Sequence, residues 1–149
     1  MRFVPVAAAT RGPMMSVTRV AKEPLIGVVD DDESVRESLP FLLAELGYAT
    51  HAFASAEEFL ASDVISRTEC LILDVMMPGM TGPQLQSELK VRGHHIPIVF
   101  ITAHGDEKMR LQAMRGGAVG FLAKPFDSGI LLDRVRAALE AGSGGNGLV

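Results

Sequence analysis

Short apolar runs that alternate with longer amphipathic segments constrain the fold of this chain more than any other feature of its sequence. The runs are rich in Val, Ile and Leu, as strands buried on both faces of a parallel sheet are. We predict strands at Leu25–Val29, Ala49–Phe53, Cys70–Leu73, Ile98–Ile101 and Val119–Leu122. Strands of this kind need helices on both sides, so the pattern predicts an α/β fold.

The segments that follow the runs place apolar residues at helical spacing. They predict helices from Glu33 to Leu46, Ala56 to Ser62, Pro83 to Arg92, Glu107 to Arg115 and Ser128 to Ala141. Gly47, Gly93 and the pair Gly116-Gly117 stand where helices should stop, because glycine adopts the left-handed C-terminal conformation at little cost. Pro40 falls inside the first helix, where a proline typically costs about 3 kcal/mol, and we expect a kink there.

The simplest topology for repeated strand–helix units with right-handed crossovers is a doubly wound sheet. The functional crevice of such a sheet lies at the carboxyl ends of its strands. The terminal segments have no sustained hydrophobic period and are rich in Gly, Ser, Pro or Ala. We therefore predict a flexible N-terminal extension over residues 1–23, one domain over residues 24–141, and a flexible Gly-rich tail over residues 142–149.

The composition argues against several classes of function. The net charge is -4 and Lys and Arg do not cluster, so direct binding of nucleic acid is not expected. Cys70 is the single cysteine, which excludes an internal disulfide and suits a small buried thiol. No apolar stretch approaches the roughly 20 residues of a membrane span. We expect a cytoplasmic protein.

Polar side chains follow three of the five predicted strands directly, and a lysine follows the fifth strand after one alanine. They are Asp30 and Asp31 after the first strand, Asp74 after the third, Thr102 after the fourth, and Lys124 after the fifth. The carboxyl ends of parallel strands share one edge of the sheet, so these side chains should converge there.

Three carboxylates in one crevice repel each other by about 4 kcal/mol per pair at 4 Å and an effective dielectric of 20. Lys124 offsets one charge, and a hard divalent cation such as Mg²⁺, or Mn²⁺ in its place, suits the remainder. Asp74 is the predicted nucleophile, because a carboxylate can attack phosphorus to give an aspartyl phosphate. Thr102 would donate a hydrogen bond to the phosphoryl group, and Lys124 would pair with it.

Each of these residues also has an ordinary explanation, since Asp caps helices, Thr ends strands, and Lys is often a solvated surface residue. Their joint occurrence at four strand ends favours a site. Capping explains Asp32 and Glu33 better, because they open the first helix. The histidines lack metal-ligand spacing and are expected on the surface or in loops, with His104 at the rim of the site.

Four motifs in this order resemble the receiver domain of two-component response regulators. They are Val29-Asp30-Asp31-Asp32, the run from Leu73-Asp74-Val75-Met76 through Met77-Pro78-Gly79-Met80 to Thr81-Gly82, Ile101-Thr102-Ala103, and Lys124-Pro125-Phe126. The resemblance extends from about Leu25 to Ala141. It implies a flavodoxin-like sheet of strand order 2-1-3-4-5.

The resemblance also implies roles for individual residues. Mg²⁺ would be bound by Asp30 or Asp31 together with Asp74 and the Met76 carbonyl, and a histidine kinase or histidine phosphotransfer protein would phosphorylate Asp74. Phosphoryl binding and the switch would involve Thr102, Ala103, Lys124 and Phe121, and the Lys124-Pro125 bond is a candidate cis peptide.

Two neighbours depart from the family's common residues. Phe121 stands where tyrosine is frequent, so it can move between buried and exposed positions but cannot make the phenolic hydrogen bond; a plain core or surface aromatic is the alternative. Met76 stands where many members carry a polar side chain, and we hypothesise that it hinders the water that hydrolyses the aspartyl phosphate.

The overall sequence pattern is similar to that of receivers joined to a helix-turn-helix output domain, but no such domain follows in this sequence. The chain is either a stand-alone receiver or one piece of a longer product. A downstream protein partner, or a homodimer through the face formed by the fourth helix, fifth strand and fifth helix, would carry the output. A metal-dependent phosphohydrolase and an unphosphorylated scaffold are the alternatives; neither nucleic acid nor membrane is an expected partner, and turnover catalysis is not expected.

Overall fold

The structure is a computed structural model that describes residues 23–148, with side chains described for residues 23–141. The predicted N-terminal extension therefore lies outside the described residues, apart from Glu23. Five parallel strands form one sheet in the order β3-β2-β4-β5-β6, which confirms the predicted strand order. The strands are β2 (Leu25–Val29), β3 (Ala49–Phe53), β4 (Cys70–Asp74), β5 (Ile98–Thr102) and β6 (Gly120–Ala123).

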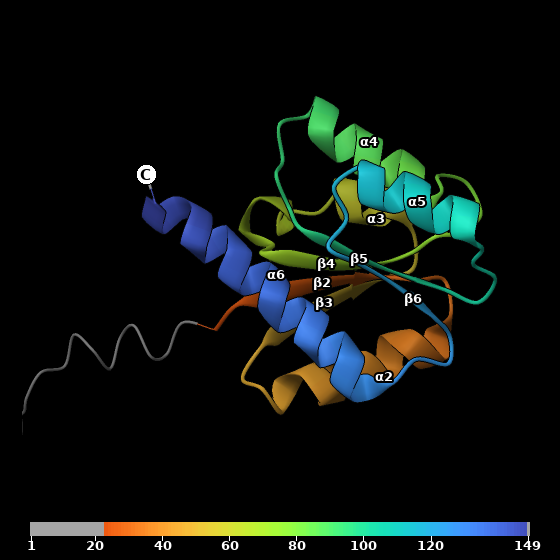
Figure 1. Cartoon of the computed structure of the whole chain (residues 1–149). Coiled ribbons are helices and arrows are strands. Elements are labelled where there is room, and N and C mark those ends of the chain that lie inside the picture. The colour runs from red at the N-terminus through yellow and green to blue at the C-terminus, as the bar shows by residue number, and fades with distance from the viewer. Residues whose placement is uncertain (1–22, 149) are drawn as a thin grey trace, which may run out of the picture.

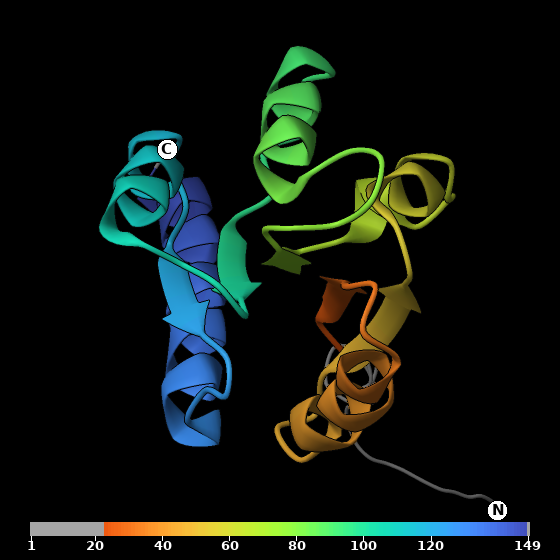
Figure 2. The same ribbon diagram turned by 90° about the vertical axis from the view of Figure 1, so that its right-hand side faces the viewer.

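Helices cover both faces of this sheet, as Figure 1 shows. They are α2 (Glu33–Ala44), α3 (Ala56–Leu60), α4 (Gly82–Val91), α5 (Glu107–Arg115) and α6 (Ser128–Leu148), with a short 3₁₀ helix, η1 (Ile65–Arg67). Helices α2 and α6 lie on one face, and α3, α4 and α5 lie on the other. The turned view in Figure 2 shows the twisted sheet between the two helical layers. The predicted α/β, doubly wound fold is confirmed.

Each face of the sheet has its own apolar core. One core packs α3 and α4 against the sheet and includes Phe59, Leu85 and Phe100, which are fully buried. The other packs α2 and α6 against the opposite face through Leu39, Leu131 and Val135, with Cys70 buried among them. Strand residues point alternately to the two faces, and both faces are covered by helices. All five residues of β2, β4 and β5 are therefore buried.

The strand register brings the ends of four strands to one edge. Val29 pairs with Leu73, so the chain leaves β2 and β4 at the same level. Thr102 pairs with Ala123, so Lys124 follows at the end of β6. The sheet alone therefore positions the residues that follow these strands as neighbours.

The predicted helix stops are confirmed at three glycines, since Gly47, Gly93 and Gly117 adopt positive φ angles of 83°, 81° and 101°. Pro40 lies inside α2, and the helix continues on both sides of it. The predicted kink at Pro40 remains a prediction.

Element ends differ from the prediction most at the C-terminus. The helix predicted to stop at Ala141 extends to Leu148 as α6. Gly-rich sequence lowers helix propensity by roughly 1 kcal/mol per glycine, but an existing helix can propagate without a new nucleus. The backbone of residues 142–148 is thus helical where sequence reasoning placed a flexible tail. The ends of α2, α3 and α4 differ from the prediction by one or two residues, α5 has the predicted bounds, and η1 was not predicted.

Candidate functional site

Three carboxylates meet where β2 and β4 end. Oxygen atoms of Asp30, Asp31 and Asp74 lie within 4.8 Å of one another. Asp30 is fully buried and Asp74 nearly so, whereas Asp31 is exposed. The predicted convergence of the acidic residues is therefore present in the structure.

Lys124 brings a positive charge to this cluster. Its Nζ atom lies 2.7 Å from Asp30 Oδ2 and 3.9 Å from Asp74 Oδ2. The Asp30 Oδ2 atom receives no well-directed hydrogen bond from any described residue, so the contact with Lys124 is an ion pair without hydrogen-bond geometry. Although burial lowers the pKa of Lys124, its contacts with Asp30 and Asp74 raise the pKa overall. The lysine is held in its charged form.

The surroundings of Asp74 disfavour its charge. Burial, followed by the negative charge of Asp30, raises the pKa of Asp74 to about 7, against the opposing effect of Lys124. One lysine thus leaves the site short of positive charge. The buried, incompletely paired oxygen of Asp30 and the all-oxygen donor set fit a hard divalent cation such as Mg²⁺.

Thr102 lies at the same edge and is fully buried. Its hydroxyl oxygen accepts a hydrogen bond of 3.2 Å from the backbone N–H of His104, which leaves the hydroxyl hydrogen free to point elsewhere. Ala103 follows as an exposed residue. His104 thus contributes its backbone to the rim of the site, while the residue itself is exposed.

Phe121 and Met76 lie near the site with different exposure. Phe121 is partly buried, and its ring centroid is 6.3 Å from that of Phe100. Met76 is 54% exposed. Both line an apolar pocket of about 140 Å³ between α4, α5 and the sheet, together with Met109. The Lys124-Pro125 peptide bond is cis.

Asp32 and Glu33 behave as capping predicts. The Asp32 side chain accepts hydrogen bonds from the backbone and hydroxyl of Ser34, and these bonds lower the pKa of Asp32. Glu33 lies in the first turn of α2. Neither residue belongs to the carboxylate cluster found among the described residues.

Sequence reasoning missed two residues that shape the site. Arg36 on α2 donates a 2.9 Å hydrogen bond to the backbone carbonyl of Asp30 and fixes the turn after β2. Gly105 lets the loop after β5 pass close to the switch candidates, since a Cβ there would lie 2.6 Å from Thr102 Cγ2 and 2.9 Å from a Phe121 ring carbon. An arginine one turn into the helix behind the acidic run was a readable signal; the approach at Gly105 depends on tertiary structure.

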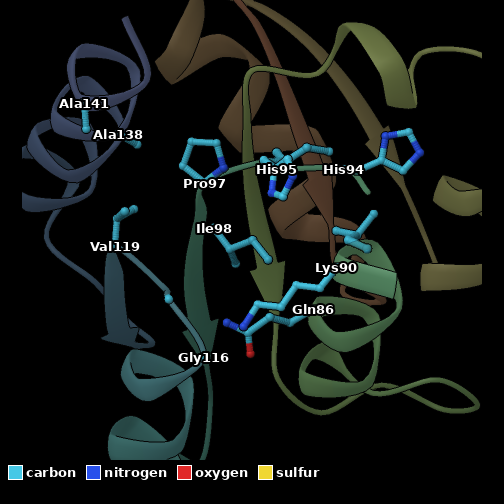
Figure 3. A pocket seen from close by; sticks show the side chains of 13 residues that line it. Gln86, Lys90, His94, His95, Pro97, Ile98, Gly116, Val119, Ala138 and Ala141 are labelled. Carbon is cyan, nitrogen blue, oxygen red and sulfur yellow. The ribbon is translucent and has the colours of Figure 1, made fainter. Parts of the chain in front are cut away.

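A larger hollow lies at the opposite edge of the sheet. This pocket of about 350 Å³, shown in Figure 3, lies beside the residues that enter β5 and β6. Gln86, Lys90, His94 and His95 line it with several apolar residues. None of the predicted site residues lines it.

A doubly wound sheet with buried carboxylates, a hydroxyl and an ammonium at its carboxyl edge defines a flavodoxin-like module suited to phosphoryl chemistry. Comparison with known proteins agrees. Residues 26–136 match the response regulator receiver domain family, and this chain belongs to that family. It is a receiver domain of the two-component response regulators.

The chain is similar to nodulation protein W of Bradyrhizobium diazoefficiens, with 48% identity over 123 residues that cover 83% of this chain and 54% of that protein. Among solved structures, it is similar to the response regulator StyR, with a TM-score of 0.78 and 43% identity over 85% of this chain and 64% of that one. The structure of FixJ-N has a TM-score of 0.71 and 37% identity, covering 80% of this chain and 95% of that one.

The chain spans about half the length of the curated relatives it matches, such as 54% of nodulation protein W. None of the helices within residues 23–148 has the length and apolar character that a membrane crossing requires.

Proposed function

We propose that Asp74 is the phospho-acceptor of this receiver domain and that a histidine kinase or a histidine phosphotransfer protein is the donor. In this reaction a carboxylate oxygen of Asp74 forms a bond to phosphorus while the bond between phosphorus and the donor nitrogen breaks. The observation that carries the proposal is the meeting of Asp30, Asp31 and Asp74 with Lys124 at the end of β4.

Asp30, Asp31, Asp74 and the backbone carbonyl of Met76 would hold Mg²⁺ or Mn²⁺. A bound divalent ion supplies positive charge that offsets the charge on the transferred oxygens. Its presence would also favour the ionised form of Asp74, the form that attacks phosphorus.

Three further residues would bind the transferred group. Lys124 would pair with a phosphoryl oxygen, since its Nζ atom already lies 3.9 Å from Asp74 Oδ2. The hydroxyl of Thr102 would donate a hydrogen bond, and Ala103 would do so through its backbone N–H, the donor group that an alanine has. Fixed donors of this kind stabilise developing negative charge without reorganisation.

Phosphorylation would then act as a switch at Thr102 and Phe121. The partly buried ring of Phe121 lies next to a pocket of about 140 Å³, which gives it room to move. The affected surface would be the face of α5, β6 and α6, where Leu111, Met114 and Ile130 are partly exposed. A downstream protein or a second copy of this chain would bind there, in the cytoplasm.

The domain would release phosphate slowly and would not act as a turnover enzyme. Met76, with more than half of its surface exposed beside Asp74, would hinder the attacking water. If so, Met76→Asn should shorten the lifetime of the aspartyl phosphate, measured as loss of label over time. An unchanged lifetime would contradict this role for Met76.

The central test is labelling with acetyl phosphate and Mg²⁺. The wild type should gain one phosphoryl group by mass spectrometry, and Asp74→Ala should gain none. Asp63→Ala, which replaces an exposed aspartate outside the carboxylate cluster, is the matched control and should be labelled like the wild type. Equal labelling of wild type and Asp74→Ala would remove Asp74 from its role.

A further inference from the structure

The loop between β4 and α4 links the proposed acceptor to one of its proposed metal ligands. It follows Asp74 directly, carries Met76, and is held at its base by two backbone hydrogen bonds. Val75 N–H donates to the Ile101 carbonyl at 3.1 Å, and Gly82 N–H donates to the Val75 carbonyl at 2.9 Å. These bonds fix the base of the loop, where it leaves β4 and enters α4, but not its tip.

The tip of this loop is held from another helix. Pro78 and Gly79, with φ +76° at Gly79, are typical of a type II turn, whose fourth residue is Met80. The N–H of Met80 donates a 3.0 Å hydrogen bond to Oε2 of Glu57, a residue 23 positions earlier in the chain. The loop is thus attached at its tip to the first turn of α3.

Glu57 is well placed to act as an anchor. Its neighbours Ala56 and Phe59 are fully buried in the core, so the backbone of α3 is fixed against the sheet. Within the described residues Glu57 forms no salt bridge, and its carboxylate remains available to Met80. A carboxylate that accepts a backbone N–H makes a stronger bond than a neutral acceptor does.

Gly79 makes room for this contact. A Cβ atom at Gly79 would lie 2.8 Å from Glu57 Oε2, and the positive φ angle disfavours any other residue there. The glycine and the carboxylate are therefore matched parts of one contact. Their pairing was not predicted from the sequence, because the two residues lie 22 positions apart.

We propose that Glu57 is a positioning residue for the phosphoryl-acceptor site. Its hydrogen bond to Met80 holds the loop so that the Met76 carbonyl stays available to the metal ion. This inference rests on the proposed function of Asp74 and its metal site. It adds a residue that touches neither the metal ion nor the phosphoryl group.

The experiment measures Mg²⁺ affinity by isothermal titration calorimetry on the full chain. Glu57→Ala should weaken Mg²⁺ binding about tenfold, at the lower end of the range for residues that orient metal ligands. Glu57→Gln keeps an oxygen acceptor without the charge and should stay within about threefold of wild type. At saturating Mg²⁺, labelling of Glu57→Ala by acetyl phosphate should approach the wild-type rate.

Glu58→Ala is the matched control. Glu58 lies on the same helix and accepts the N–H of Ala54 at 3.2 Å, and among the described residues its side chain forms no hydrogen bond or ion pair with the loop. Its loss should leave Mg²⁺ affinity within about twofold of wild type. Equal weakening by Glu58→Ala and Glu57→Ala would mean that α3 stability, not the loop contact, is responsible, and would overturn the proposal.

Gly79→Ala provides an independent variant. It should weaken Mg²⁺ binding in the wild type, because its Cβ atom would displace the Glu57 carboxylate and a φ angle of +76° disfavours alanine. The strain in φ does not depend on Glu57 and should persist in a Glu57→Ala background, but the shared contact should make the combined loss smaller than the sum of the two single losses. Additive effects, or wild-type Mg²⁺ affinity in Glu57→Ala, would overturn the proposal.

The amide hydrogen exchange of Met80 separates this inference from the proposed function. Without metal, Glu57→Ala should speed exchange at Met80 while the N–H of Val75 stays protected. If wild-type protein were not labelled at Asp74, the proposed function would fail, yet faster exchange at Met80 would still support the loop contact. Unchanged exchange at Met80 would overturn it.

Discussion

The two edges of the sheet are built from the same strands but hold different chemistry. The carboxyl edge gathers buried carboxylates and a lysine 2.7 Å from Asp30. The amino edge holds a pocket of about 350 Å³ with two histidines and a lysine, and no ion pair among the described residues joins its lining side chains. In this protein, a cluster of buried charged groups is therefore a better sign of function than the volume of a pocket.

β4 shows the same contrast within five residues. Burial raises the pKa of Cys70, at its beginning, to about 12 and the pKa of Asp74, at its end, to about 7. The thiol is thereby kept neutral and inert at physiological pH. The carboxylate is brought to the range in which a nearby cation decides its charge.

The largest expected effect concerns the two lysines. Lys124→Met should slow phosphorylation by acetyl phosphate by about 100-fold or more, because it removes a charge fixed next to the transferred group. Lys90→Met, at the amino-edge pocket, should change the rate less than about twofold. Rates come from mass spectra over time at fixed Mg²⁺. A similar loss of phosphorylation rate in Lys124→Met and Lys90→Met would show that the two edges of the sheet do not differ in their part in the reaction.

A second prediction concerns stability without metal. Asp74→Asn should raise the free energy of unfolding by about 1–2 kcal/mol in EDTA at pH 8, because it removes a largely buried charge and its repulsion with Asp30 and leaves Lys124 paired. Urea titrations would measure it. Asp63→Asn, on the exposed surface, should change the value by less than about 0.5 kcal/mol.

The gain in Asp74→Asn should depend on pH with a definite sign. The folded-state pKa of Asp74, about 7, lies above the ordinary value of 3.8. Wild-type stability should therefore fall as pH rises from about 4 to about 7, because the folded state resists ionisation of Asp74. The variant should lack this loss, and its advantage should vanish near pH 4. An advantage that is the same at pH 4 and pH 8 would contradict the assigned cause.

A smaller effect is expected at the amino edge. Gln86, largely buried, donates a 3.3 Å hydrogen bond to the Ala113 carbonyl and links α4 to α5. Gln86→Ala should cost about 1 kcal/mol of unfolding free energy, since the carbonyl keeps its bond from Ala118. Labelling of Asp74 should not change. A loss of labelling in a folded variant would show that the amino edge takes part in the reaction.

The smallest effect is expected for the reactivity of the Cys70 thiol in the folded protein. The native protein should not react with a thiol reagent at pH 8, because the thiol is buried and protonated. In denaturant, one equivalent should react. Fast reaction in the folded state would mean that the start of β4 opens, and that the rigid sheet assumed for both edges is wrong.

The sequence was sufficient to predict the sheet and the convergence of residues at its carboxyl edge. Both depend on local rules: apolar runs form strands, and parallel strands end together. The contacts of Glu57 and Gly105 were not predictable in this way, because each joins elements whose distance is set by packing. The helical course of α6 beyond Ala141 was also not predicted, because glycine has a low helix propensity, whereas a helix that has already formed can extend through glycines.

The strand order also explains why the cation of the site is a lysine. Lys124 leaves β6 and Asp30 leaves β2, and two strands, β4 and β5, lie between them in the sheet. At roughly 4.8 Å per strand, about 14 Å of sheet separates the two backbones. The long stem of Lys124, the side chain of Asp30 and the 2.7 Å between their charged atoms together cover most of that span, so a cation on a shorter stem would fall short. This position therefore requires a long side chain as well as a positive charge.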